Sequence, residues 1–261
     1  MSSENELPIF QVTFGAVVES FYRAGMNGYL NRYLNSTFNP LTSSNQSIIG
    51  SLFPNMKVQI PSRIVYLNGL KQIRFYLENN VDPNKSNHPL LIKMAINIAP
   101  GLIMTPMSSI LEACHVSNTN PKPLYYRALD GITFRSIREI CFGIGINRLT
   151  DYCNDELCPS TITNSTGRIM LGSLMAGGIS GYISHIPHNL STLKLMFPDV
   201  SYYTHFKTLQ KNRNIPSFIP SNWHTKYKLF ATLVFPTGVV IRTTQIAGSF
   251  IILNTIVYLM N

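Results

Sequence analysis

The chain has 261 residues, of which 45% are hydrophobic and only 13% are charged. A soluble domain usually carries about 25% charged residues, so the composition indicates a membrane protein. The mean hydropathy of +0.09 is low for a bundle of purely apolar spans and indicates polar residues in its interior. The net charge of +9 comes from cations scattered through apolar stretches, so we expect no nucleic-acid partner.

The sequence also lacks the patterns of an enzyme or of a metal protein. It has no nucleophile elbow, P-loop or dinucleotide fingerprint, so we expect no catalytic residue and no enzyme activity. Four cysteines and six singly scattered histidines do not have the spacing of a zinc site, so we expect no metal. Residues 1–8 are polar and acidic and do not resemble a cleavable signal peptide.

Six stretches reach the length of roughly 20 mostly apolar residues that a membrane-spanning helix needs. They are residues 7–34, 60–81, 89–115, 124–152, 167–197 and 227–260. The first carries Glu19 and Arg23 four residues apart in the attracting order, and such a pair should face the bundle interior.

The fifth stretch has the most distinctive pattern. Gly177 and Gly181 form a smooth strip on which a neighbouring helix can approach closely. Pro187 follows and should kink the helix, because it removes one backbone donor.

Charges between the stretches predict the topology. The segment between the fifth and sixth stretches is basic, whereas the segments on the opposite side are acidic. The basic set is Lys207, Lys211, Arg213, Lys226 and Lys228, and the acidic set is Glu4, Glu6, Glu78, Asp82, Asp151, Asp155 and Glu156. This alternation predicts six spans with both termini on the acidic side.

An internal repeat divides the chain into three two-helix units, 1–88, 89–163 and 164–261. Each even-numbered stretch carries a cation followed by polar residues, namely Lys71 to Arg74, Arg135 to Arg138 (with Ser136 between them) and Arg242 to Gln245. Pro106 in the third stretch corresponds to Pro187 in the fifth. Repeats of this kind indicate a pseudo-symmetric bundle.

These features resemble the mitochondrial carrier family, whose odd-numbered helices carry the pattern P-x-[DE]-x-x-[KR]. The corresponding residues here are Pro106, Ser108 and Leu111 in the third stretch, and Pro187, Asn189, Thr192 and Lys194 in the fifth. The resemblance implies an all-α membrane protein with six transmembrane helices in a pseudo-threefold barrel. It also implies the mitochondrial inner membrane, with both termini toward the intermembrane space, and no cofactor beyond bound cardiolipin.

The signature charges that close a carrier's matrix gate are missing here. The gate on the opposite side of a carrier uses an acid followed by a base late in each even-numbered helix. Here the sixth stretch has the uncharged Asn254 and Val257, the second has the acid Glu78 without the base, and the fourth has Arg148 before Asp151, which reverses the order. We therefore predict that transport is lost and that the protein is a structural accessory subunit of an inner-membrane complex, with the respiratory chain as the expected host.

The alternative is an active carrier that exchanges a small anionic metabolite bound by Lys71, Arg135, Ser136 and Arg242. Without a substrate, these cations would instead pair with internal acids such as Glu19, Glu112 or Glu139, or with lipid phosphate.

Three local expectations remain. Tyr126 and Arg127, at the start of the fourth stretch, are expected to bind cardiolipin or another acidic lipid. Cys153 and Cys158 are expected to be free thiols, with a disulfide between them as the alternative. Residues 118–123 leave no room for the amphipathic matrix helix of a carrier repeat.

Overall fold

The computed structural model describes residues 8–38, 52–85, 87–116, 120–159 and 162–260. Within these ranges every regular element is helical, which confirms the predicted all-α class. The main helices are α1 (Ile9–Phe38), α3 (Met56–Asn80), α4 (Pro89–Ile103), α5 (Thr105–Ala113), α7 (Ile132–Ile144), α9 (Ser165–Ile183), α10 (His185–Met196) and α13 (Val239–Met260). Shorter helices connect them, namely α6 (Leu124–Leu129), α8 (Thr150–Tyr152), α11 (Tyr202–Lys211) and α12 (His224–Val234).

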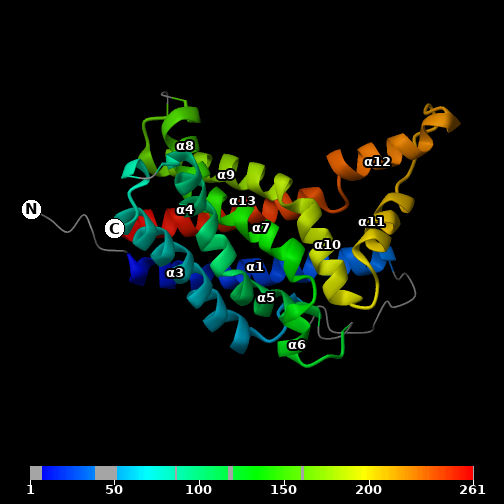
Figure 1. Cartoon of the computed structure of the whole chain (residues 1–261), viewed down its shortest axis with the longest axis horizontal. Helices are drawn as coiled ribbons and strands as arrows, with labels where there is room; N and C mark the ends of the chain where they lie inside the picture. Colours follow the sequence, from blue (N-terminus) through cyan, green and yellow to red (C-terminus); the bar gives the residue numbers. More distant parts are fainter. Residues whose placement is uncertain (1–7, 39–51, 86, 117–119, 160–161, 261) are drawn as a thin grey trace, which may run out of the picture.

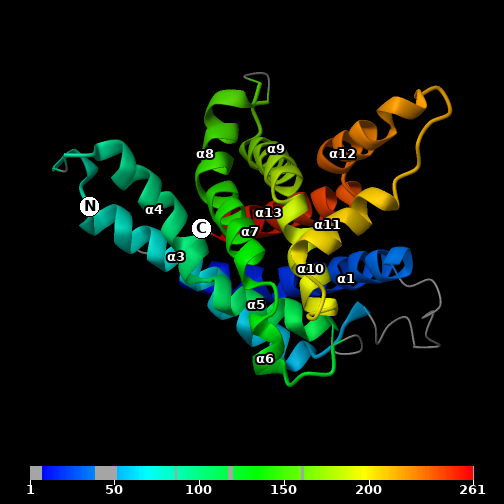
Figure 2. The same cartoon turned by 45° about the vertical axis from the view of Figure 1, so that its right-hand side comes forward.

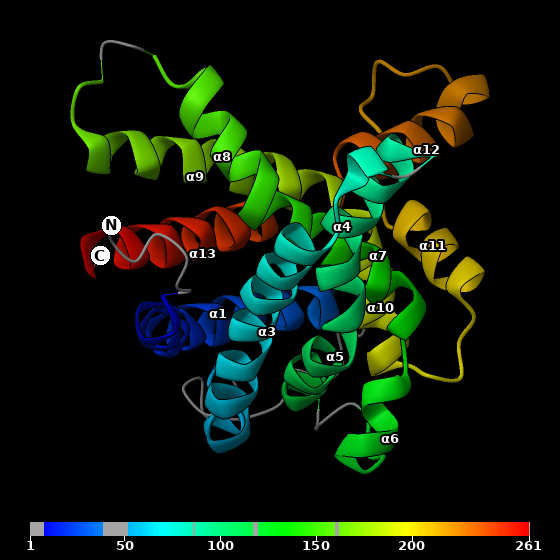
Figure 3. The same ribbon diagram turned by 60° about the vertical axis from the view of Figure 1, so that its left-hand side comes forward.

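The helices pack as a ring of neighbours. Helix α1 packs on α3, and α3 packs on α4 and α5. Helices α4 and α5 pack on α7, which in turn contacts α9 and α10. Helix α9 packs on α13, and α13 packs on α1, which closes the ring. Helices α1, α13 and α9 run side by side along the long axis (Figures 1 and 3). The start of α1 meets the end of α13, where Gln11 Nε2 donates a hydrogen bond to Met260 O over 3.4 Å.

By length and composition, two helical stretches can cross a membrane, Pro89–Val116 and Ser221–Met260. The bent pair α9 and α10 would make a third span. Long apolar helices of this kind are what a membrane protein needs. Six predicted spans are more than this criterion finds among the described residues.

Helices break near two prolines, Pro187, where a kink was predicted, and Pro106, and both breaks lie slightly upstream of the proline. Helices α9 and α10 meet at 56° at Ser184, three residues before Pro187. Helices α4 and α5 are separated at Met104, two residues before Pro106. Proline removes its own N–H and its ring crowds the carbonyl four residues earlier, so the distortion falls in the preceding turn.

Two spans predicted as continuous are interrupted, and both interruptions contain a glycine with positive φ. The predicted helix 124–152 breaks before α7, where Gly131 has a φ of 82°. The predicted helix 227–260 breaks between α12 and α13, where Gly238 has a φ of 80° beside Pro236. Glycine adopts this conformation without steric penalty, so these two glycines end the helices.

Two segments expected as connections are partly helical, and a third is not. Residues 120–123, before the fourth span, contain no helix, and residues 117–119 lie outside the described part, so the absence of a matrix helix from this connection stays a prediction. Helix α6 begins after it, within the predicted fourth span. The fourth span contains a π-helical turn at Gly145–Leu149 and continues past Tyr152 through a second one, Cys153–Leu157. The basic segment after the fifth span contains α11 rather than loop alone. Glu4 and Glu6 lie outside the described residues.

The predicted glycine strip is confirmed at the contact between α9 and α13. A Cβ atom added to Gly177 would lie 2.5 Å from Ala247 Cα, and one added to Gly181 would lie 2.9 Å from Thr243 Cα. The neighbouring Gly178 faces open space, with nothing within 4 Å of such an atom. The two backbones therefore approach closely along one face of α9 only.

Many apolar side chains are exposed on the outside of the bundle, and several charged side chains are buried inside it beside an apolar core. Large apolar side chains are exposed on several helices, including Phe10, Phe14, Leu90, Leu91, Leu174, Ile183, Phe230 and Val240. In contrast, Glu19, Arg135 and Arg242 have no exposed surface. This distribution suits a lipid environment, where apolar surface faces the hydrocarbon and charges face the bundle interior.

Candidate functional site: a buried ion network

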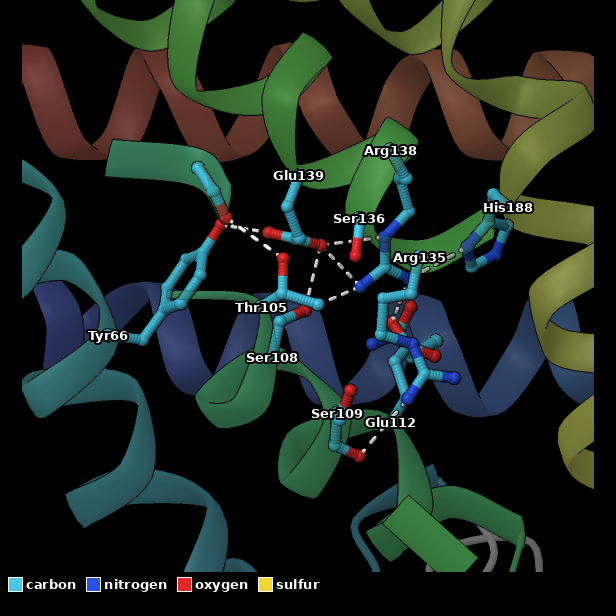
Figure 4. Close-up of polar contacts among 12 residues, drawn as sticks. Tyr66, Thr105, Ser108, Ser109, Glu112, Arg135, Ser136, Arg138, Glu139 and His188 are labelled. Atoms are coloured by element: carbon cyan, nitrogen blue, oxygen red, sulfur yellow. Dashed lines mark hydrogen bonds and ion pairs between the residues drawn. The ribbon is translucent and has the colours of Figure 1, made fainter. Parts of the chain in front are cut away.

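Arg138 on α7 is the centre of a fully buried polar network (Figure 4). Its Nη1 lies 2.8 Å from Glu112 Oε1 on α5, and its Nε donates to Glu139 Oε1 over 2.7 Å. Nη2 donates to Ser108 Oγ over 2.6 Å, and Nη1 donates to Nδ1 of His188 on α10 over 3.0 Å. One guanidinium group thus joins three helices that belong to three different predicted spans.

A second ion cluster centres on Glu19 of α1. Its carboxylate accepts hydrogen bonds from Arg63 of α3, one of them from Nε over 2.5 Å. Arg23, one turn further along α1, lies 3.8 Å from Glu19 and donates to Ser249 of α13 over 3.4 Å. The predicted attraction between Glu19 and Arg23 and their interior placement are both confirmed, since the two residues are 0% and 7% exposed.

Aromatic side chains connect the two clusters. The Tyr66 hydroxyl donates to Glu139, while the Arg63 guanidinium lies 4.9 Å from the centre of the Tyr66 ring. Arg23 lies 5.1 Å from the centre of the Phe142 ring. A cavity of about 10 Å³, roughly the room for one water molecule, lies between the clusters and is lined by Arg23, Arg63, Ser108, Glu112 and Arg138, among others. Between the two clusters the interior is thus filled by interlocked side chains.

The three glutamates are paired, but not with the predicted cations. The sequence suggested that they would neutralise Lys71, Arg135 or Arg242. Instead Glu19 pairs with Arg63 and Arg23, while Glu112 and Glu139 pair with Arg138. In the sequence Arg138 stands out only as part of the internal repeat. Arg135 lies three residues earlier on the same helix, and nothing in the sequence indicates which of the two arginines pairs with the glutamates.

Arg135 and Arg242 are both 0% exposed and only partly satisfied. Arg135 Nη1 donates to Ser109 O over 3.3 Å, and Arg242 Nη1 donates to Gln245 Oε1 over 2.6 Å. The Nε and Nη2 atoms of both arginines have no hydrogen-bond partner among the described residues. Ser136 donates to Ile132 O of its own helix over 3.1 Å.

Lys71, the third cation of the predicted substrate site, lies apart from Arg135 and Arg242. It lines a separate cavity of about 10 Å³ whose other walls include Leu70, Ile146, Leu253 and Asn254. These walls are mostly apolar, and neither arginine is among them. The structure therefore does not bring the three cations into one cavity.

The degenerate signature residues have structural contacts. Ser108 Oγ donates to Glu139 over 2.7 Å, and Asn189 Nδ2 donates to Thr237 O over 3.0 Å. Lys194 Nζ donates to the backbone oxygen of Val200 over 3.0 Å, close to the end of α10, so it does not reach across the bundle. Leu111 and Thr192 are buried, and Pro106 and Pro187 lie in the first turns of α5 and α10.

Ion pairs also join the helices at the far end of α3. Glu78 of α3 lies 2.8 Å from Arg148 of the first π turn, and Arg74 lies 3.1 Å from Asp151 of α8. Arg148 also donates to Asn97 of α4 over 3.0 Å. The reversed order of Arg148 and Asp151 therefore does not prevent cross-helix pairing, because each residue finds a partner of opposite charge on α3.

We expect this outer pair to contribute little to stability. Arg148 and Glu78 are 51% and 32% exposed, and exposed ion pairs contribute about 0–1 kcal/mol. A double-mutant cycle of Glu78→Gln and Arg148→Met, followed by thermal unfolding at low and high salt, should give a small coupling free energy that salt removes. A coupling of several kcal/mol, unaffected by salt, would contradict this expectation.

The expectation of free thiols is confirmed, whereas lipid binding at Tyr126 and Arg127 stays a prediction. Arg127 is only 6% exposed and donates to Asn120 O over 3.2 Å, whereas Tyr126 is 62% exposed, so the pair does not present a cation at the surface. Cys153 and Cys158 are both free and buried. Cys153 belongs to the central apolar cluster, while the Cys158 thiol donates to Arg168 O over 3.5 Å, so the two side chains have different surroundings.

Among the described residues, no group of three or more His, Cys, Asp or Glu side chains is arranged to hold a metal ion. The sequence matches no model of a protein family. A comparison with curated proteins gives no significant match either.

Proposed function

We propose that the chain is a divergent mitochondrial carrier-type bundle that has lost transport and acts as a structural accessory subunit of an inner-membrane complex. The proposal starts from the ring of neighbouring helices, which agrees with a barrel of three two-helix units. In this proposal six spans cross the membrane. Three are the single helices α1, α3 and α13, and the others are α4 with α5, α7 with its π turns, and α9 with α10. The meeting of the start of α1 with the end of α13 favours an even number of crossings.

The observation that carries the loss of transport is the Arg138 network. A transporter alternates between two states, each opening the path from one side, and needs them to be similar in free energy. Here Arg138 joins α5, α7 and α10, while Glu78 and Arg148 join helices at the far end of α3. The buried Arg138 contacts must be broken before α5, α7 and α10 can separate, whereas the exposed outer pair adds little resistance.

The second candidate, an anion carrier, is favoured by one specific observation. Arg135 and Arg242 are buried and keep unpartnered guanidinium nitrogens among the described residues. Such groups are expensive to bury alone and would be stabilised by a carboxylate or phosphate. The separate cavity of Lys71 and the filled interior weigh against a substrate site formed by all three cations.

Counter-exchange in liposomes distinguishes these two functions. Because the interior is interlocked, we expect no saturable uptake of carboxylates, nucleotides or phosphate by the reconstituted protein. Saturable uptake that Arg135→Ala or Arg242→Ala abolishes, while Arg32→Ala at an exposed site on α1 leaves it intact, would establish the anion carrier instead. Native electrophoresis of inner membranes provides the second arm. The subunit should migrate within a large complex, and migration alone would contradict the structural role.

A further inference from the structure

Helices α11 and α12, with the chain between them, project from the bundle at the end opposite the start of α1 (Figures 1 and 2). We refer to residues 202–234 as the arm. Leu209 of α11 is buried against Leu190 and Leu193 of α10, which anchors the arm to the bundle. Lys228 Nζ of α12 donates to Lys211 O of α11 over 3.1 Å and joins the two helices.

The outer face of α11 combines an aromatic ring with a cation. Tyr203 is 67% exposed, and Lys207, one turn later, is also exposed. Lys207 Nζ lies 4.5 Å from the centre of the Tyr203 ring. The buried residues of this helix, His205 and Leu209, lie on its other face. Helix α11 is therefore amphipathic, and its exposed side offers an aromatic group and a positive charge together.

The outer face of α12 repeats this combination. Trp223 immediately precedes the helix and is 55% exposed, and Lys226 Nζ lies 5.0 Å from its ring centre. Phe230 and Leu233 continue the exposed stripe at helical spacing. In the chain between the two helices, Phe218 is the most exposed large apolar side chain, at 80%. Each of the two helices thus exposes an aromatic ring next to a cation.

The position of the arm follows from the length of α13, given the membrane placement proposed above. Helix α13 has 22 residues, and at about 1.5 Å per residue it is about as long as the hydrocarbon core is thick. Helix α12 precedes it beyond the non-helical residues 235–238, so it lies outside the hydrocarbon core, on the side where the headgroups begin. Residues 197–234 carry five lysines and arginines and a single acid, Asp199.

We propose that the arm docks on the membrane surface and binds acidic phospholipid headgroups. Trp223, Phe230 and Tyr203 enter the headgroup region, where aromatic side chains with a polar edge are favoured. Lys207 and Lys226, held over the rings, contact the lipid phosphates. The source of the anion is the bilayer that surrounds the bundle, because on each helix the cation lies against an exposed, membrane-seeking ring.

Trp223 is the only tryptophan in the chain, so its fluorescence reports on the arm alone. The full chain is placed in nanodiscs of phosphatidylcholine, or of phosphatidylcholine mixed with phosphatidylglycerol, each with brominated acyl chains as quencher. We expect stronger quenching and a blue-shifted emission in the acidic nanodiscs. Added salt should weaken both effects, because the attraction is screened.

Two variants and a matched control test the role of the lysines. Lys207→Gln with Lys226→Gln should lower the ratio of docked to free arm by about fivefold per lysine in acidic nanodiscs. Arginine at both positions should restore docking, because it keeps the charge. The control, Lys85→Gln with Lys93→Gln, removes the same charge from exposed lysines outside the arm and should change nothing.

Equal quenching in neutral and acidic nanodiscs would overturn the proposal, as would an unchanged signal in the double glutamine variant. Shielding of Trp223 only within a native complex would show that a protein covers the arm, which would also overturn it. None of these outcomes depends on transport, since a working carrier could dock its arm in the same way. A failure here is therefore distinguishable from a failure of the proposed function.

Discussion

Replacing Gly177 by alanine is expected to destabilise the bundle more than any other single methyl addition in α9. The new Cβ would lie 2.5 Å from Ala247 Cα and 2.9 Å from Ala247 N. Both are backbone atoms of α13 and cannot turn aside as a flexible side chain could. The helices must move apart, and overpacking of this kind costs about 1–3 kcal/mol or more.

The matched control is Gly178→Ala, one residue away on the same helix. A Cβ there meets nothing within 4 Å, so only helix propensity changes, and alanine is favoured over glycine by about 1 kcal/mol. Thermal unfolding in detergent, followed with a thiol-reactive dye on the buried cysteines, measures both variants. A lower midpoint for Gly177→Ala with an unchanged or higher one for Gly178→Ala is expected. Equal midpoints would show that α9 and α13 do not approach this closely.

Replacing Arg138 by methionine should have the second large effect. Glu112 and Glu139 would lose their shared cation within the bundle interior. Breaking a buried ion pair by removing one partner typically destabilises a protein by about 3–5 kcal/mol. Unfolding in denaturant or by heat should show this loss, whereas Arg32→Met on the exposed side of α1 should have little effect.

A triple variant separates loss of the ion pairs from loss of packing. Arg138→Met combined with Glu112→Gln and Glu139→Gln leaves no unpaired carboxylate, and amide groups can still hydrogen-bond. We expect this variant to recover a large part of the stability that the single change removes. If Arg138→Met alone is as stable as the native protein, the network is not the lock on which the proposed function depends.

Local patterns predicted those parts of the structure that depend on neighbouring turns of one helix. Gly177 and Gly181 share a face because they are four residues apart, so their close contact with another helix could be inferred. Glu19 and Arg23 likewise share a face, and their charge places that face inside. The all-helical class follows from the same periodicity.

The partners of each charge could not be predicted in this way. Arg135 and Arg138 lie one turn apart on the same helix, and only packing decides that Arg138 meets Glu112 while Arg135 meets the backbone of Ser109. The breaks at Gly131 and Gly238 were missed because glycine also occurs inside apolar helices, as at Gly177. The positive φ that ends a helix is a property of the tertiary fold.

The two π turns after α7 change which way the residues beyond them point. A π turn accommodates one extra residue without ending the helix. In an α-helix each residue advances by about 100°, so every residue after the first π turn is rotated by about that angle from the direction that simple counting assigns. Arg148 and Asp151 lie at or beyond this point, at Gly145–Leu149 and in α8. Past Ile144, residues at equal offsets in the three units therefore no longer point in equivalent directions. Arg148 and Asp151, although reversed in sequence order, can for this reason each still face a residue of opposite charge on α3.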